Sequence, residues 1–84
     1  MKILYKETFV NRLEKQIDYI ARDSPTRARK FRNELLQQIS NIPQNPYRYR
    51  KSVYFDRKDI RDLIFKGYTV VFKLQMKQLK YLVL

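Results

Sequence analysis

Residues 60–74 read Ile-Arg-Asp-Leu-Ile-Phe-Lys-Gly-Tyr-Thr-Val-Val-Phe-Lys-Leu. The runs on either side of Lys66-Gly67 are rich in β-branched and aromatic residues, which favour strands. Gly67 is the only glycine in the sequence, and it lies where a two-residue turn requires a positive φ. This stretch therefore predicts a β-hairpin with strands over residues 60–65 and 68–74.

The predicted turn fixes the register of the hairpin and so assigns its side chains to two faces. One face is nearly all apolar and is expected to face the core. The other face is mixed, so it is expected to be wet or covered by something outside this chain. The core face pairs Phe65 with Tyr68, Leu63 with Val70 and Arg61 with Phe72, and the other carries Ile60, Asp62, Ile64, Thr69, Val71 and Lys73.

Two amphipathic helices are predicted before the hairpin, over about residues 7–22 and 25–42. Thr8 is the expected N-cap of the first helix, and Ser24 that of the second, with Pro25 at its first helical position. A link this short makes the helices antiparallel. Their apolar stripes are spaced for helices and consist of Phe9, Leu13, Ile17 and Ile20, then Ala28, Phe31, Leu35, Ile39 and Ile42.

Three further strands are predicted, over residues 1–6, the later half of residues 47–55, and residues 79–84. The order β-α-α-β-β-β-β predicts an α+β fold, with an N-terminal strand and an antiparallel helical hairpin packed on an antiparallel sheet. A chain of 84 residues has room for one core, so residues 1–84 are expected to form a single domain.

The composition is strongly basic, with nineteen Lys and Arg residues against eight Asp and Glu and a net charge of +11. Such an excess favours an anionic partner. The sequence has neither cysteine nor histidine, so it lacks the commonest general base and the commonest metal ligands. We expect no cofactor and no metal site. No apolar run reaches the ~18 residues of a membrane span, and we expect a cytoplasmic protein.

Residues 47–51, Tyr-Arg-Tyr-Arg-Lys, interleave aromatic and basic side chains. This pattern suits nucleic-acid contact, in which rings stack on bases and guanidinium groups bind phosphate. It equally suits tyrosines that pack on the helices while the cations reach solvent. Arg61, at the edge of the core face, is expected to pair with a carboxylate or a helix C-terminus. The candidates for target or nucleic-acid contact are Arg48, Tyr49, Arg50, Lys51 and Lys73.

Three motifs, taken in their order along the chain, resemble those of a known protein family. These are Asp23-Ser24-Pro25 with the apolar stripe that follows it, then Ile60-Arg61-Asp62-Leu63 and Lys66-Gly67-Tyr68-Thr69-Val70-Val71-Phe72. Together they resemble the RelE/ParE toxin superfamily over essentially the whole chain. The resemblance implies the β-α-α-β-β-β-β fold. It also implies the toxin of a type II toxin–antitoxin pair, kept inactive by an acidic antitoxin protein.

The superfamily has two branches, and the residues of this chain do not match both equally well. RelE-like toxins cut mRNA in the ribosomal A site, and ParE-like toxins poison DNA gyrase. The basic RelE-like positions of the hairpin correspond to Ile60, Asp62 and Thr69, and the later ones would lie beyond Leu84. We therefore favour the ParE-like branch, leave the catalytic residues unassigned and expect weak or no ribosome-dependent RNA cleavage.

Two alternatives stay open. One is a metal-independent RelE-like endoribonuclease that uses Arg48, Arg50, Lys51 and Lys73 in a shifted arrangement, since cations and tyrosines can cleave RNA. The other is a non-toxic basic nucleic-acid-binding domain. For the antitoxin we expect an amphipathic segment on the mixed hairpin face, with contacts at Ile60, Ile64, Thr69 and Val71.

Overall fold

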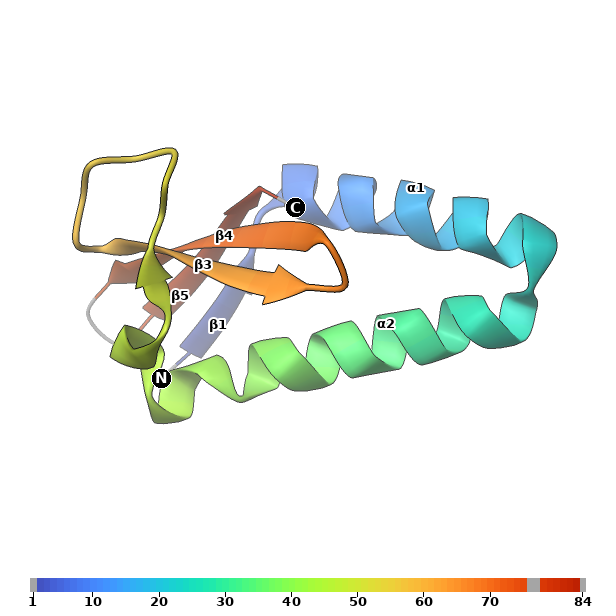
Figure 1. Ribbon diagram of the computed structural model, residues 1–84, viewed down its shortest axis with the longest axis horizontal. Helices are drawn as coiled ribbons and strands as arrows, with labels where there is room; N and C mark the ends of the chain where they lie inside the picture. Colours follow the sequence, from blue (N-terminus) through green and yellow to red (C-terminus); the bar gives the residue numbers. More distant parts are fainter. Residues whose placement is uncertain (1, 76–77, 84) are drawn as a thin grey trace.

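The computed structural model describes the backbone of residues 2–75 and 78–83 and the side chains of residues 3–75. The predicted element order and the α+β class are confirmed (Figure 1). The elements are β1 (Lys2–Tyr5), α1 (Glu7–Asp23), α2 (Pro25–Ser40), 3₁₀ turns at Ile42–Gln44 and Pro46–Arg48, β2 (Arg50–Lys51), β3 (Ile60–Phe65), β4 (Tyr68–Gln75) and β5 (Gln78–Val83).

The central hairpin forms as predicted. Lys66 and Gly67 have φ values of 47° and 84°, the two positive values that a type I′ turn requires. Phe65 pairs with Tyr68, and the register continues along β3 and β4 as predicted. The side of the hairpin predicted to face the core supplies buried residues of the hydrophobic core, which are Leu63, Phe65, Val70 and Phe72.

The five strands form one sheet in the order β1-β5-β4-β3-β2. Strands β2, β3, β4 and β5 pair antiparallel, but β1 pairs with β5 in parallel. The predicted antiparallel sheet is confirmed for β2 to β5, and β1 adds a parallel pairing at one edge that the sequence does not indicate. Strands joined by a tight turn must run antiparallel, whereas the ends of the chain meet without a turn that dictates their direction.

The helix boundaries follow the predicted capping at α2 but not at α1. The Ser24 hydroxyl accepts a hydrogen bond from the Arg27 amide at 3.2 Å, and Pro25 opens the helix. Helix α1 begins at Glu7 with Lys6 as its N-cap, so the prediction that Thr8 caps it is wrong. Helix α2 ends at Ser40, two residues before the predicted position, because the chain tightens into a 3₁₀ turn that contains Pro43.

Both helices pack on the apolar face of the sheet. Phe31 of α2 meets the rings of Phe65 and Tyr68 edge-on, at centroid distances of 5.5 and 5.4 Å. Phe9 of α1 and Leu35 of α2 are fully buried in the same cluster. The tip of the helical hairpin extends past the β3–β4 turn (Figure 1).

An ion pair links α2 to the hairpin turn. Lys66 Nζ lies 2.7 Å from Glu34 Oε2. The hydrogen bond from Lys66 is the main reason that the pKa of Glu34 lies below its usual value. Because both side chains are partly exposed, the pair orients the turn and contributes little to the free energy of unfolding.

Truncation of Leu35 tests the packing of α2 on the sheet. Leu35 is fully buried, so Leu35→Ala is expected to lower the free energy of unfolding by about 2–5 kcal/mol, measured by urea denaturation. Gln37→Ala, on the exposed face of the same helix, is the control and is expected to change it by less than ~0.5 kcal/mol. Equal effects of the two variants would show that Leu35 is not a core residue.

Candidate functional site

The later part of the chain between α2 and β3 forms a surface segment, residues 46–59, that we call the basic–aromatic segment. The predicted strand over the later half of residues 47–55 is wrong, because the strand covers Arg50–Lys51 alone. The Ser52 amide still donates to the Ile60 carbonyl, at 2.9 Å, and the chain then turns, with the Phe55 amide donating to the Ser52 carbonyl at 3.4 Å. Most of the segment is therefore held by specific contacts and not by a strand ladder.

Arg61 of β3 fastens both ends of the segment. Its Nη1 donates to the Tyr49 carbonyl at 3.0 Å, and its Nε donates to the Lys58 carbonyl at 2.9 Å. Its guanidinium carbon lies 5.3 Å from the centre of the Tyr47 ring. The prediction of a structural role is confirmed, and the partners are not carboxylates but two carbonyls, that of Tyr49 at the C-terminal end of the 3₁₀ turn Pro46–Arg48 and that of Lys58 in the loop.

Asp62 fastens the middle of the segment from the other face of β3. Its side chain is fully buried and pairs with the half-exposed Arg50, whose Nη2 lies 3.3 Å from Asp62 Oδ2. The same oxygen accepts hydrogen bonds from Arg50 Nε and from the Val53 amide, both at 3.3 Å. Adjacent residues of one strand therefore hold the segment from both faces of the sheet.

The Asp62 contacts also show that part of the mixed hairpin face is covered from within the chain. The segment after β2 turns over this face, as the bond from Val53 shows. The expectation that the face is wet or covered from outside is wrong at Ile60, Asp62 and Val71, which are buried.

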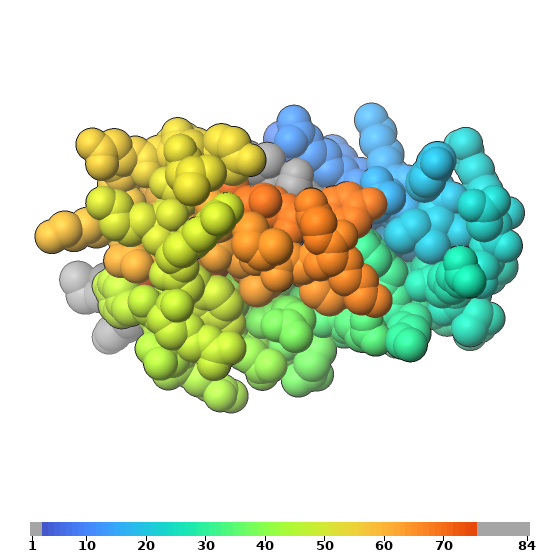
Figure 2. Space-filling view, viewed as in Figure 1, coloured from blue at the N-terminus to red at the C-terminus, as the bar shows by residue number. Residues whose placement is uncertain are grey.

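The outer surface of the segment exposes apolar and aromatic side chains. Tyr54 is 67% exposed and Phe55 40%. The turn that carries them is fixed from below, because the hydroxyl of the buried Ser52 accepts a hydrogen bond from the Tyr54 amide at 3.3 Å. In Figure 2 the segment forms a broad yellow and yellow-green surface beside the orange β3–β4 hairpin. Such a surface can offer rings for stacking or for insertion into a partner's pocket, next to cations.

Charged groups border these rings. Arg57 pairs with Asp59, Nη2 to Oδ2 at 2.6 Å, and Lys51 Nζ lies 4.0 Å from Asp56 Oδ1. Burial is the largest influence on Asp59 and would raise its pKa, but the hydrogen bond from Arg57 and the nearby positive charges outweigh it, so the pKa lies below its usual value. Lys58 is exposed on the same turn.

Of the residues predicted to contact the target, some pack inside the protein and others lie exposed on its surface. Tyr49 is half-buried and packs edge-on against Phe72 of β4, with ring centroids 5.6 Å apart, so this tyrosine has a packing role, but its ring partner lies in the sheet and not in the helices. Arg48 is exposed and lies 5.3 Å from the centre of the Tyr49 ring.

The remaining predicted cations do not converge. The register pairs Arg50 with Asp62, and Lys51 with Arg61, so Arg50 and Lys51 take opposite faces of the sheet. Lys73 pairs with Ile60 and therefore shares the face of Arg50. Sequence reasoning missed the exposed turn at residues 53–55 because its β-branched and aromatic residues resemble a strand.

The predicted antitoxin contacts also divide. Ile64 and Thr69 are paired across β3 and β4; Ile64 is 52% exposed and Thr69 is half-buried. Ile60 and Val71 are buried and offer little surface. The pair beside the hairpin turn is therefore the accessible part of the predicted set.

An N-terminal strand, a helical hairpin and a sheet that carries a basic surface segment define an α+β domain of the RelE/ParE toxin type. The family model described as the ParE toxin of type II toxin-antitoxin system, parDE, matches residues 3–84. The chain belongs to this family. It is the toxin component of a type II toxin–antitoxin system and has a cognate antitoxin as its partner. A comparison with curated protein sequences gives no significant match, and among the described residues no helix is long and apolar enough to cross a membrane.

Removal of the Asp62 carboxylate tests how the segment is held. Asp62→Ala leaves the Val53 amide without its acceptor, so the free energy of unfolding is expected to fall by about 1–3 kcal/mol. Hydrogen exchange at the Val53 and Tyr54 amides is expected to speed up. The control is Asp56→Ala, whose carboxylate is fully exposed and whose loss is expected to cost less than ~0.5 kcal/mol. Unchanged exchange at Val53 in Asp62→Ala would contradict the anchoring role.

Proposed function

We propose that this toxin arrests growth by binding an essential protein target, DNA gyrase in the ParE-like manner, through the basic–aromatic segment. The observation that carries the proposal is the exposed turn of Val53, Tyr54 and Phe55, which is fixed from below by Ser52 and Asp62. A turn whose backbone is fixed before binding loses less conformational freedom on binding, and aromatic side chains are frequent hot spots of protein interfaces.

The arrangement of cations supports a binding role over a RelE-like ribonuclease. Stabilising the charge that develops at one phosphate requires donors that converge on it. Arg50 is committed to Asp62, and Lys51 takes the opposite face of the sheet from Arg50. The exposed Arg48 and Lys58 are better suited to steering an anionic partner towards the segment.

We further propose that the antitoxin is net acidic, that it binds in the cytoplasm, and that part of it lies against Ile64 and Thr69. The net charge of +11 favours an acidic partner through long-range attraction. An amphipathic segment would cover the exposed Ile64 side chain with apolar residues and meet the surrounding lysines and arginines with carboxylates.

The target proposal is tested by expressing the chain in bacteria and by adding the purified chain to a gyrase supercoiling assay. Growth arrest and inhibited supercoiling are expected. The double variant Tyr54→Ala, Phe55→Ala is expected to need at least about tenfold more protein for the same inhibition, since interface hot spots contribute that much. Arg29→Gln, an exposed change on α2, is the control and is expected to inhibit like the parent chain.

Mapping of mRNA 5′ ends in the same cells separates the alternatives. A-site cuts with normal supercoiling would overturn the gyrase proposal in favour of a ribonuclease. Growth without arrest at full expression would favour a non-toxic nucleic-acid-binding domain.

Salt dependence tests the charge of the antitoxin. If the partner is acidic, the association rate constant is expected to fall several-fold between about 0.05 and 0.15 M salt, with a smaller change in the dissociation rate. Stopped-flow or surface-based kinetics with the cognate antitoxin measure both. An association rate that is the same at the two salt concentrations would rule out electrostatic steering.

A further inference from the structure

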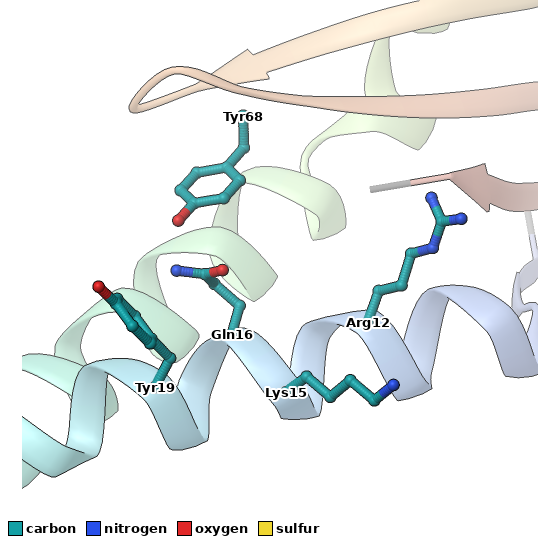
Figure 3. Close-up of a pocket in the computed structure, with 5 residues that line it drawn as sticks. All are labelled: Arg12, Lys15, Gln16, Tyr19 and Tyr68. Atoms are coloured by element: carbon teal, nitrogen blue, oxygen red, sulfur yellow. The ribbon is translucent and has the colours of Figure 1, made fainter.

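A cleft opens where α1 passes the start of β4, at the opposite end of the β3–β4 hairpin from the basic–aromatic segment. Its volume is about 350 Å³, within the range of small-molecule sites. Helix α1 supplies one wall, and the ring of Tyr68 closes it from the sheet (Figure 3). The lining residues are Arg12, Lys15, Gln16, Tyr19 and Tyr68.

The charged part of the cleft is purely cationic. Arg12 and Lys15 are three residues apart on α1, so their side chains start from neighbouring parts of one helix face, and Figure 3 shows Arg12 directed towards the sheet and Lys15 along the outer side of the helix. Neither forms an ion pair with any residue in the described part of the chain, and none of the lining residues is acidic. Both side chains are long and exposed, so both can turn towards an anion in the cleft and donate hydrogen bonds to it.

The other part of the cleft is aromatic and polar. Tyr68 is held in place because Phe31 meets its ring edge-on at 5.4 Å. Tyr19 is 63% exposed, so a face of its ring is free for a ligand. Figure 3 shows the hydroxyl of Tyr68 and the side-chain amide of Gln16 both directed into the space between the two tyrosines. This end of the cleft therefore offers a stacking surface beside hydrogen-bonding groups.

We propose that this cleft binds a nucleoside phosphate, either free or as one unit of a single-stranded nucleic acid. Arg12 and Lys15 bind the phosphate, the base stacks on Tyr19, and the Gln16 amide and the Tyr68 hydroxyl bond to the polar edge of the base. A plain anion would leave the aromatic end unused, and an uncharged aromatic compound would leave the two cations unpaired. The site is separate from the surface proposed for the protein target and does not depend on what that target is.

Calorimetric titration of the full chain at about 0.15 M salt tests the site, because salt at this level screens non-specific attraction. The probes are adenosine monophosphate, a short oligoadenylate, adenosine and inorganic phosphate. One saturable site is expected for the first two probes, and it should bind the nucleotide at least about tenfold more tightly than adenosine or phosphate. Tighter binding of the mononucleotide indicates a free nucleotide as the ligand, and tighter binding of the oligonucleotide indicates a nucleic acid strand.

Matched variants assign the binding to the cleft. Arg12→Gln is expected to weaken nucleotide binding about tenfold, whereas Arg29→Gln, which removes the same charge from α2, is expected to leave it within twofold. Tyr19→Ala is expected to weaken binding at least fivefold, and Tyr19→Phe is expected to retain it because the ring still stacks. All three positions are exposed on the surface of a helix, and an unchanged melting temperature confirms that each variant is folded.

Three results would overturn the inference. The first is the absence of saturable nucleotide binding. The second is an equal loss in Arg12→Gln and Arg29→Gln, which would mean attraction by net charge alone. The third is phosphate binding as tight as nucleotide binding, which would remove any role for the tyrosines.

Discussion

The left-handed turn at Lys66 and Gly67 is the constraint on which the rest of the structure depends. A two-residue turn with two positive φ values leaves one register for β3 and β4. A shift of one residue would exchange the two faces of both strands, and the apolar face would lose the helices that cover it. Lysine in this conformation has an energetic cost. Its ammonium group lies near Glu34 and 5.5 Å from the centre of the Phe65 ring, contacts that favour the strained position.

The same register decides where the functional surface can form. Arg61 and Asp62 are consecutive and so lie on opposite faces of β3, and the register places Arg61 on the face of Phe72 and Asp62 on the face of Val71. Each of these side chains bonds to a different part of the basic–aromatic segment. The segment has little regular structure beyond a 3₁₀ turn and the two residues of β2, yet the backbone of the turn that carries its exposed rings is held at the Val53 and Tyr54 amides. A single strand therefore serves both the core and the surface.

Local signals in the sequence predict most of the fold, and the failures occur where distant segments meet. The hairpin register and the Ser24-Pro25 boundary follow from steric and capping preferences of a few neighbouring residues. The parallel pairing of β1 with β5 cannot be predicted in this way, because no turn joins these two strands and fixes their relative direction. The burial of Ile60 and Val71 was missed for a related reason. Their burial depends on the path of the basic–aromatic segment over the sheet. The buried Asp62 carboxylate holds that path through Arg50 and Val53. The spacing of apolar residues in the sequence does not indicate these contacts.

The brevity of β2 has a consequence for the free toxin. This strand forms one edge of the sheet, and an exposed edge is a template on which another chain can add a strand. Here β2 offers only two residues, Arg50 and Lys51, before the chain turns away, and both are cations that would repel the β2 strand of a second molecule. The like charges therefore disfavour pairing of two toxin molecules through their β2 strands.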